Sequence, residues 1–373
     1  MAKTIICIAT PLYAPDIGGP ATHVALLEHG LSRSEFELRI VKFSDVRGLP
    51  KILRHIVYFF KVLAAGRGAR FIYALDPTSV GVPAFFAAKL LGKKFLLRVG
   101  GDYAWEQGTQ RFGVTETLDE FITHRQPRMI VRRLQFVQSY IARRAVCVVA
   151  PSEYLAGIIR TWGVAAYRIK VVYSQPELAV SNLSKSDARK KLKLHEDEEI
   201  IFSSGRLVPW KGFEGLVDAT ARVRNDRPAR LYIAGEGPYR ESLVQHIQTK
   251  DAQNFVTLLG QLSQDELAVW LAAADMFVLN TAYEGLSHAL LEAFAAHTPV
   301  ITTPVGGNTE LVDDESTGLL VEHNNIRKLS AAIMHLLTDR VFAEKIASQA
   351  YASLSRFNKD AALQSLSSLF KSL

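Results

Sequence analysis

Short apolar runs rich in Val, Ile and Phe recur along the chain, and most precede a polar loop and then a helical pattern. The hydrophobicity within each run is continuous rather than alternating, which is typical of parallel strands buried on both faces by helices. The pattern therefore predicts an α/β protein with two doubly wound halves, each built on a parallel sheet. The predicted strands are TIICIA, LRIVKF, RFIYAL, KFLLRV, VCVVA and IKVVY in the first half, and EIIFSS, ARLYIAG, FVTLLG, MFVLN, PVITT and GLLVE in the second.

A polar stretch rich in Ser and Lys, at residues 174–196, separates the two sets of strands and is expected to connect two domains. At 373 residues the chain is long for one core, which agrees with this division. We expect the first domain at 1–178 and the second at 179–358. The helical pattern at 359–373 has an apolar face, and we expect it to pack back on the first domain.

The composition is that of a soluble globular protein, with 48% hydrophobic and 22% charged residues. The N-terminus lacks the features of a signal peptide. Basic residues interrupt the most hydrophobic helical stretch, at 52–66, so we expect no membrane span. Cys7 and Cys147 lie in apolar runs and are predicted to be buried thiols in a reducing compartment. These features favour a cytoplasmic location.

The net charge of +7 is distributed unevenly. Residues 1–180 hold 24 Lys and Arg against 13 Asp and Glu, whereas residues 181–373 hold 20 against 24. Much of the positive charge belongs to a helical pattern at 125–144, whose arginines are suited to attract an anionic membrane or a diphosphate-linked lipid. No nucleic-acid recognition motif accompanies the charge. The apolar face of this pattern, which we expect in the core, consists of Ile130, Leu134, Val137 and Ile141.

The densest polar signal follows the strand MFVLN, where Glu284 and Gly285 stand in a short loop before a helix expected at 286–297. Free backbone N–H groups at the start of that helix would form an anion site suited to phosphate. Glu292 follows Glu284 by eight residues, a helical rise of roughly 12 Å, similar to the span from a sugar ring across a diphosphate to a ribose. The alternative is a carboxylate at a helix N-terminus and a solvated surface glutamate. The N–H groups in question belong to Leu286, Ser287 and His288.

Arg206 and Lys211 stand in the loop after the strand EIIFSS, at the carboxyl end of a parallel strand, where ligands bind in such sheets. The planar fork of Arg and the point charge of Lys would together neutralise a diphosphate. Ordinary solvated residues on a polar loop are the alternative. The backbone at Leu262, after another strand, is placed to hydrogen-bond a base.

Gly18 and Gly19 end the loop after the first strand and allow the backbone to approach a bound group closely. The chain has no GxGxxG fingerprint, which disfavours an NAD-dependent dehydrogenase.

Together these segments resemble family 4 of the retaining glycosyltransferases, which have the GT-B fold of two Rossmann-like domains facing a deep cleft. The resemblance spans nearly the whole chain. The E-x7-E element with GR…KG before it is specific as a set, whereas each piece alone is not. The segments concerned are PDIGGPATHV, PSEYLAGIIRTWGV, GRLVPWKG, AGEGP, YEGLSHALLEA and PVGGNTELVDDESTGLLV.

The resemblance implies a nucleotide-sugar donor site in the second domain and an acceptor site in the first. Arg206 and Lys211 match the diphosphate-binding pair of the family. Glu284 matches the glutamate that contacts the transferring sugar, and Glu292 matches the one that holds the ribose hydroxyls. The family needs no divalent metal, and this chain shows neither a DxD motif nor metal-ligand spacing, so no cofactor is expected.

Gly19, with Gly18 beside it, matches the glycine loop near the donor phosphate. Two positions depart from the family pattern. Where many relatives carry a histidine after the strand KFLLRV, this chain has two glycines and Asp102, and we take Asp102 and Glu106 as candidates for acceptor binding. Ser287 stands where glycine is usual and is suited to add a hydroxyl contact.

The implied activity is transfer of a sugar from a UDP- or GDP-sugar to a glycan or lipid-linked acceptor, in the synthesis of cell-envelope polysaccharide or glycolipid. The expected mechanism is front-face transfer with retention. Alternatives of the same fold are a nucleotide-sugar epimerase and a sugar-phosphate synthase. An alternative of a different class is an inactive subunit that binds a nucleotide.

Overall fold

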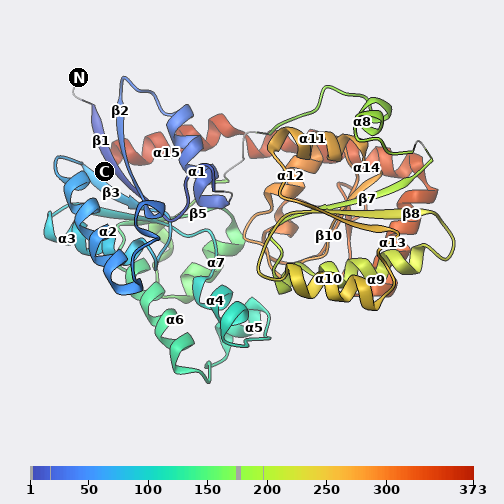
Figure 1. Ribbon diagram of the computed structural model, residues 1–373. Coiled ribbons are helices and arrows are strands. Elements are labelled where there is room, and N and C mark those ends of the chain that lie inside the picture. Colours follow the sequence, from blue (N-terminus) through green and yellow to red (C-terminus); the bar gives the residue numbers. More distant parts are fainter. Residues whose placement is uncertain (1–2, 17, 174–177, 196) are drawn as a thin grey trace. The chain divides into compact units, whose positions relative to one another are not determined.

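The computed structural model describes residues 3–16, 18–173, 178–195 and 197–373, which form two compact units (Figure 1). The first unit comprises Met1–Glu177 and Phe357–Leu373, and the second comprises Leu178–Arg356. Each contains one six-stranded parallel sheet, which confirms the predicted α/β fold class. The boundaries lie within two residues of those expected, and every predicted apolar run overlaps a strand.

The sheet of the first unit has the strand order β2-β1-β3-β4-β5-β6, and all neighbouring strands are parallel. The interior strands β3 and β5 are buried at every position, which explains their continuous hydrophobicity. The chain order changes direction between β1 and β3, so the carboxyl ends of these two strands mark the switch point of this sheet. The strands are β1 (Thr4–Thr10), β2 (Phe36–Lys42), β3 (Phe71–Ala74), β4 (Lys94–Arg98), β5 (Cys147–Ala150) and β6 (Ile169–Val171).

Helices cover both faces of this sheet (Figure 1). α1 and α15 pack together on one face, and α2, α3 and α6 cover the other. Ala362, Leu363, Leu366 and Phe370 of α15 join the core of the first unit, as the apolar pattern of this segment requires. The helices are α1 (Gly19–Gly30), α2 (Lys51–Gly66), α3 (Gly81–Leu90), α4 (Tyr103–Arg111), α5 (Leu118–Thr123), α6 (Met129–Ala142), α7 (Glu153–Thr161) and α15 (Lys359–Ser372).

The buried face of α6 agrees with the predicted one only in part. Ile141 is buried as predicted, whereas Ile130 is 43% exposed and Val131 and Gln138 are buried in addition. The side-chain amide of Gln138 donates to Asp102 and accepts from the backbone N–H of Ala104, which stabilises a polar residue in the interior. A glutamine in an apolar pattern is normally assigned to the surface, so the predicted face left out Gln138.

The sheet of the second unit has the strand order β12-β11-β10-β7-β8-β9 and is also parallel throughout. Its chain order changes direction between β7 and β10, which are hydrogen-bonded neighbours at the centre of the sheet (Figure 1). The strands are β7 (Glu199–Ser204), β8 (Ala229–Ala234), β9 (Val256–Gly260), β10 (Met276–Leu279), β11 (Val300–Thr302) and β12 (Leu319–Leu320).

The helices of the second unit lie on both faces of its sheet, with α9, α10 and α13 together on one and α11 and α12 on the other (Figure 1). Helix α14 contacts both α13 and α12. The helices are α8 (Lys185–Lys191), α9 (Phe213–Val223), α10 (Arg240–Thr249), α11 (Gln264–Ala273), α12 (His288–Ala295), α13 (Ile326–Thr338) and α14 (Arg340–Ser353).

The connection expected at 174–196 contains a helix that the sequence analysis did not predict. Residues 174–177 and 196 lie outside the described residues, and α8 occupies part of the remainder. Ser184 caps α8, and Arg189 is buried where it donates to Asp275 just before β10. Lys185 also pairs with Asp275, at 2.7 Å. The sequence analysis assigned these basic residues to a polar connection between domains. In the structure they attach α8 to the second unit.

Cys7 and Cys147 are both free and buried, as predicted. Burial raises the pKa of the Cys7 thiol to about 12. In the part of the chain that the structure describes, no helix combines the length and the apolar character that a membrane crossing requires.

Candidate functional site

The loops that follow β7 and β10 meet at the switch point of the second sheet. Because the strands are parallel neighbours, their carboxyl ends emerge at the same edge, which is the usual ligand position in an open α/β sheet. The loop after β10 is held to the loop after β7 by the backbone N–H of Ala282, which donates to the carbonyl of Trp210 at 2.7 Å. The side-chain amide of Asn280 also donates to the carbonyl of Gly212, at 2.8 Å.

Lys211 and Glu284 form an ion pair at this edge, with the lysine ammonium donating to Glu284 Oε1. Their side chains are only 14% and 15% exposed. The lysine Nζ lies 3.5 Å from where a Cβ would stand on Gly205, so the loop after β7 folds closely around the lysine. The structure thus brings together two residues that the sequence placed in one donor site from positions 73 residues apart.

Arg206 precedes Lys211 by five residues in the same loop, and its side chain is exposed. Within the part of the chain that the structure describes, its guanidinium has no acidic partner. A free guanidinium at the carboxyl edge of β7 presents a planar set of donors that suits phosphate oxygens.

Helix α12 begins later than predicted. It starts at His288, and Ser287 is its N-cap, with the serine hydroxyl accepting from the backbone N–H of Leu290 at 3.3 Å. Leu286 and Ser287 therefore precede the helix instead of forming its first turn, and Ser287 uses its hydroxyl as a cap. Only the step from His288 to Glu292 is helical, a rise of about 6 Å, so the 12 Å rise estimated from the Glu284–Glu292 spacing was wrong.

Glu292 is buried inside α12, at 8% exposure. Burial raises the pKa of its carboxyl to about 7, although a hydrogen bond from Gln264 opposes this shift. A solvated surface glutamate, which was the alternative explanation of Glu292, does not fit this environment.

A double glycine after β11 supports the Glu284 loop, and the sequence analysis gave it no role. The backbone N–H of Gly307 donates to the carbonyl of Glu284 at 2.9 Å. A Cβ on Gly306 would overlap that carbonyl oxygen, and a Cβ on Gly307 would overlap the carbonyl oxygen of Gly285. Only glycine permits this approach. In the sequence, the double glycine of PVGG directly after a predicted strand was the feature that could have indicated this contact.

The glycines of AGEGP after β8 have a similar structural role. A Cβ on Gly235 or on Gly237 would overlap backbone atoms of the β7 loop, at Gly205 and Leu207 respectively. The backbone N–H of Gly235 donates to the carbonyl of Gly260 at 2.7 Å, so the β9 loop that leads to Leu262 is held at the same edge.

Gly18 and Gly19 lie in the first unit, at the start of α1. Gly18 is the N-cap of α1 with a φ of 149°, and no side chain caps this helix. A Cβ on Gly19 would lie 4.0 Å from Nη1 of Arg98, the last residue of β4. Arg98 is 2% exposed, and burial lowers its pKa.

Arg98 is therefore a second candidate functional residue that the sequence analysis missed. Its Nε has no hydrogen-bond partner, and among the described residues no carboxylate pairs with its guanidinium. A buried cation is costly unless something compensates it, and the uncapped N-terminus of α1 adds further positive potential nearby. The signal was a charged residue inside the apolar run KFLLRV.

Asp102 is the N-cap of α4 and is 1% exposed. Its Oδ1 accepts from the backbone N–H of Trp105 at 2.9 Å and from Gln138 at 3.0 Å. Burial raises the pKa of this carboxyl. Glu106 lies in the first turn of the same helix. These contacts give Asp102 a structural role, and acceptor binding by either residue stays a prediction.

Within the described residues, no three His, Cys, Asp or Glu side chains are close enough to hold a metal ion.

Residues 184–353 match the family model of glycosyl transferases group 1, so the second unit carries a region of this family. The chain is 39% identical over 165 residues to a GDP-mannose-dependent monoacylated α-(1-6)-phosphatidylinositol monomannoside mannosyltransferase from Corynebacterium glutamicum, which covers 42% of each chain. It is 32% identical over 231 residues to a GDP-mannose-dependent α-(1-6)-phosphatidylinositol monomannoside mannosyltransferase from Mycobacterium tuberculosis, covering 57% of this chain and 56% of that one. The chain spans about half the length of the curated relatives it matches.

Solved structures resemble the whole chain. Sucrose-phosphate synthase from Thermosynechococcus elongatus superposes with a TM-score of 0.81 at 21% identity, covering 99% of both chains. HepE from Anabaena, in complex with UDP and glucose, superposes with the same TM-score at 18% identity, covering 99% of this chain and all of that one. At these identities the likeness shows the fold, and it agrees with the predicted GT-B fold of two Rossmann-like units.

Proposed function

We propose that this chain is a retaining glycosyltransferase of family 4 that transfers a sugar from a nucleotide-diphosphate sugar to a glycan or lipid-linked acceptor. The observation that carries the proposal is the Lys211–Glu284 pair at the switch point of the second sheet, within the region that matches glycosyl transferases group 1. The two related mannosyltransferases are GDP-mannose-dependent, and solved structures of HepE hold UDP or UDP-glucose.

The pair suggests where the donor's reacting bond lies. Lys211 is suited to a phosphate oxygen and Glu284 to sugar hydroxyls, and the two side chains are within hydrogen-bond distance of each other. A donor that lies across them would have its sugar–phosphate bond beside the pair. Arg206, exposed on the same loop, would bind the diphosphate from a second direction.

In the proposed front-face reaction, the bond between the anomeric carbon and the diphosphate oxygen breaks, and the acceptor oxygen bonds to the same face of that carbon. The acceptor proton passes to the departing diphosphate. Negative charge grows on the diphosphate in the transition state, and Arg206 and Lys211 would stabilise it. This sequence of steps uses no metal ion.

Glu292 would hold the ribose hydroxyls, and Gly18 and Gly19 would have the donor-phosphate role of the family's glycine loop. Glu292 is buried, so a ribose bound there would replace little water and would find a carboxyl group held in a fixed position.

A donor screen tests the proposal directly. Thermal unfolding is followed with GDP-mannose, UDP-glucose and ADP-glucose, because a bound ligand raises the melting temperature by mass action. We expect one of the first two to stabilise the wild-type chain and to lose its effect in Lys211→Ala.

Product analysis with the stabilising donor then separates the alternatives. Transfer to an acceptor supports the proposal, whereas conversion of the free nucleotide sugar without any acceptor identifies an epimerase. Transfer to a sugar phosphate identifies a synthase. Binding of the donor without hydrolysis or transfer identifies an inactive nucleotide-binding subunit.

A further inference from the structure

Helix α2 exposes apolar side chains on the face that points away from its sheet. Tyr58 and Val62 are fully buried, whereas Ile52, Ile56 and Phe60 are 79%, 48% and 59% exposed. The three exposed residues are spaced four apart, so they form one stripe along the helix. A surface helix normally carries polar residues there, and a continuous exposed apolar surface marks an interaction site.

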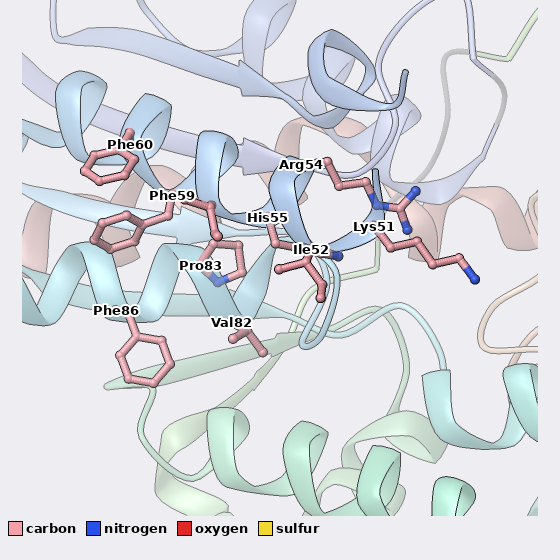
Figure 2. A pocket seen from close by; sticks show the side chains of 10 residues that line it. Lys51, Ile52, Arg54, His55, Phe59, Phe60, Val82, Pro83 and Phe86 are labelled. Atoms are coloured by element: carbon pink, nitrogen blue, oxygen red, sulfur yellow. The ribbon is translucent and has the colours of Figure 1, made fainter. Parts of the chain in front are cut away.

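Side chains of α3 lie beside this stripe, and residues of the two helices together line a groove of about 800 Å³. Figure 2 shows Phe59 and Phe60 of α2 near Phe86 of α3 at one end of the groove, and Lys51 and Arg54 at the other. Phe86 is 47% exposed, and Leu90, one turn further along α3, is 68% exposed. The groove is thus apolar along its length and basic at one end.

Aromatic rings continue the apolar surface from α3 to α6. The ring of Phe86 lies 5.3 Å from that of Phe85, which lies 6.3 Å from the ring of Tyr140 on α6. Tyr140 in turn lies 5.8 Å from Phe136, whose side chain is 63% exposed. We call the exposed apolar side chains along this groove and this chain of rings the apolar face. Its members are Ile52, Ile56, Phe60, Phe86, Leu90 and Phe136.

The three helices that form the apolar face carry charge of one sign. The sequences of α2, α3 and α6 contain no Asp or Glu. Lys61 pairs with Asp45 from outside these helices at 3.1 Å, and the guanidinium of Arg144 lies 3.3 Å above the ring of Tyr140. The basic residues within the three helices are Lys51, Arg54, Lys61, Lys89, Arg132 and Arg133.

We propose that the apolar face docks on an anionic lipid bilayer. Phenylalanine and isoleucine side chains would enter the boundary between headgroups and acyl chains, and the surrounding lysines and arginines would extend to the phosphates. Charge complementarity selects this occupant, because a bilayer supplies apolar depth and a dense layer of negative charge together. The proposal deepens the proposed function, since such a membrane presents lipid-linked acceptors, but binding to lipid is measurable without transferase activity.

Vesicle co-sedimentation tests the proposal with the full chain. We expect the protein to bind vesicles of equal parts phosphatidylglycerol and phosphatidylcholine, and to bind pure phosphatidylcholine much more weakly. Phe60→Ser and Phe86→Ser are each expected to lower the partition coefficient about tenfold, since each removes one apolar side chain from the lipid. Tyr167→Ser is the matched control, because Tyr167 is an aromatic residue of the same unit with 88% exposure outside this face.

Charge removal provides the second arm. Lys51→Gln and Lys89→Gln are each expected to weaken binding about fivefold, as loss of one cation near an anionic surface predicts. Equal binding to both kinds of vesicle, or equal binding by Phe60→Ser and wild type, would overturn the proposal. A concentration-dependent dimer in light scattering that Phe60→Ser abolishes would overturn it in favour of a second copy of the chain.

Donor-induced thermal stabilisation separates this proposal from the proposed function. Phe60→Ser and Phe86→Ser are expected to keep that stabilisation at the wild-type level while they lose vesicle binding. A chain that binds vesicles but no nucleotide sugar would overturn the proposed function alone.

Discussion

Lys211 donates a hydrogen bond to Glu284, and this ion pair joins the loop after β7 to the loop after β10. Each of the two charges compensates the other while both side chains are largely shielded from water. A phosphate that binds Lys211 would share the ammonium, which has three donors, rather than displace the carboxylate. The pair therefore orients the lysine before any ligand arrives.

Replacing Lys211 by Ala is expected to lower kcat by about 10²-fold or more, because it removes a cation from the charge that develops on the diphosphate. It also leaves Glu284 without its partner in a largely buried position. Initial rates of sugar transfer measure the effect.

Lys250→Ala is the control for this substitution. Lys250 lies in the second unit and pairs with Asp218 at the surface, at 3.3 Å, and such pairs contribute little to stability. We expect wild-type rates for this variant. Near-normal transfer by Lys211→Ala would remove the lysine from the proposed mechanism.

The strands and the meeting of Lys211 with Glu284 were predictable for one reason. Parallel strands buried on both faces are continuous apolar runs, and their carboxyl ends lie at one edge of the sheet. The sequence placed both residues in loops after such runs, which puts them at the carboxyl edge of one sheet, and the family resemblance assigned them to one donor site.

Other features depend on contacts that no local pattern encodes. The buried face of α6 includes Gln138 because the fold supplies Asp102 as its partner. Helix α12 begins at His288 because Ser287 caps it, whereas the apolar period alone extends the helix further in both directions. In the sequence, Arg98 is a single charged residue within a predicted strand. Only the fold shows that its guanidinium is buried beside Gly19.

Glu292 should make the stability of the second unit depend on pH. Its pKa rises from 4.5 to about 7 on burial, so between these values the folded chain keeps a proton that the unfolded chain has released. The free energy of unfolding therefore falls as the pH rises through this range, by about 3 kcal/mol in total from this group. Glu292→Gln, which stays neutral, should remove that part of the pH dependence.

Urea unfolding of wild type and Glu292→Gln, followed by circular dichroism from pH 4.5 to 8, measures the difference. We expect the two proteins to have similar stability at the acid end and the variant to be the more stable one above pH 7. Parallel pH profiles would show that Glu292 titrates as an ordinary surface carboxyl.

Arg98→Met is expected to stabilise the first unit and to impair function. Removing a buried cation with no acidic partner should raise the free energy of unfolding by about 1 to 3 kcal/mol. If the guanidinium binds an anionic group of a substrate, the same change should lower kcat/KM by about tenfold or more. Urea unfolding and transfer kinetics on one preparation measure both effects.

Arg160→Met is the matched control for Arg98. Arg160 is exposed in the same unit and pairs weakly with Glu153, at 3.4 Å, so its replacement should change stability by no more than about 0.5 kcal/mol. Loss of stability in Arg98→Met would indicate that the guanidinium has a structural role in the folded chain.

Gly307 supports the Glu284 loop through its backbone. Replacing it therefore tests the position of that loop without removing a charge. Gly307→Ala would place a Cβ against the carbonyl oxygen of Gly285, which is backbone and must therefore shift. We expect kcat/KM to fall about tenfold or more, because small displacements of positioned groups are costly in catalysis. Gly157→Ala is the control, since Gly157 lies within α7 with open space around it and alanine there should stabilise the helix by about 0.5 to 1 kcal/mol. Wild-type kinetics in Gly307→Ala would show that the position of the Glu284 loop does not limit the reaction.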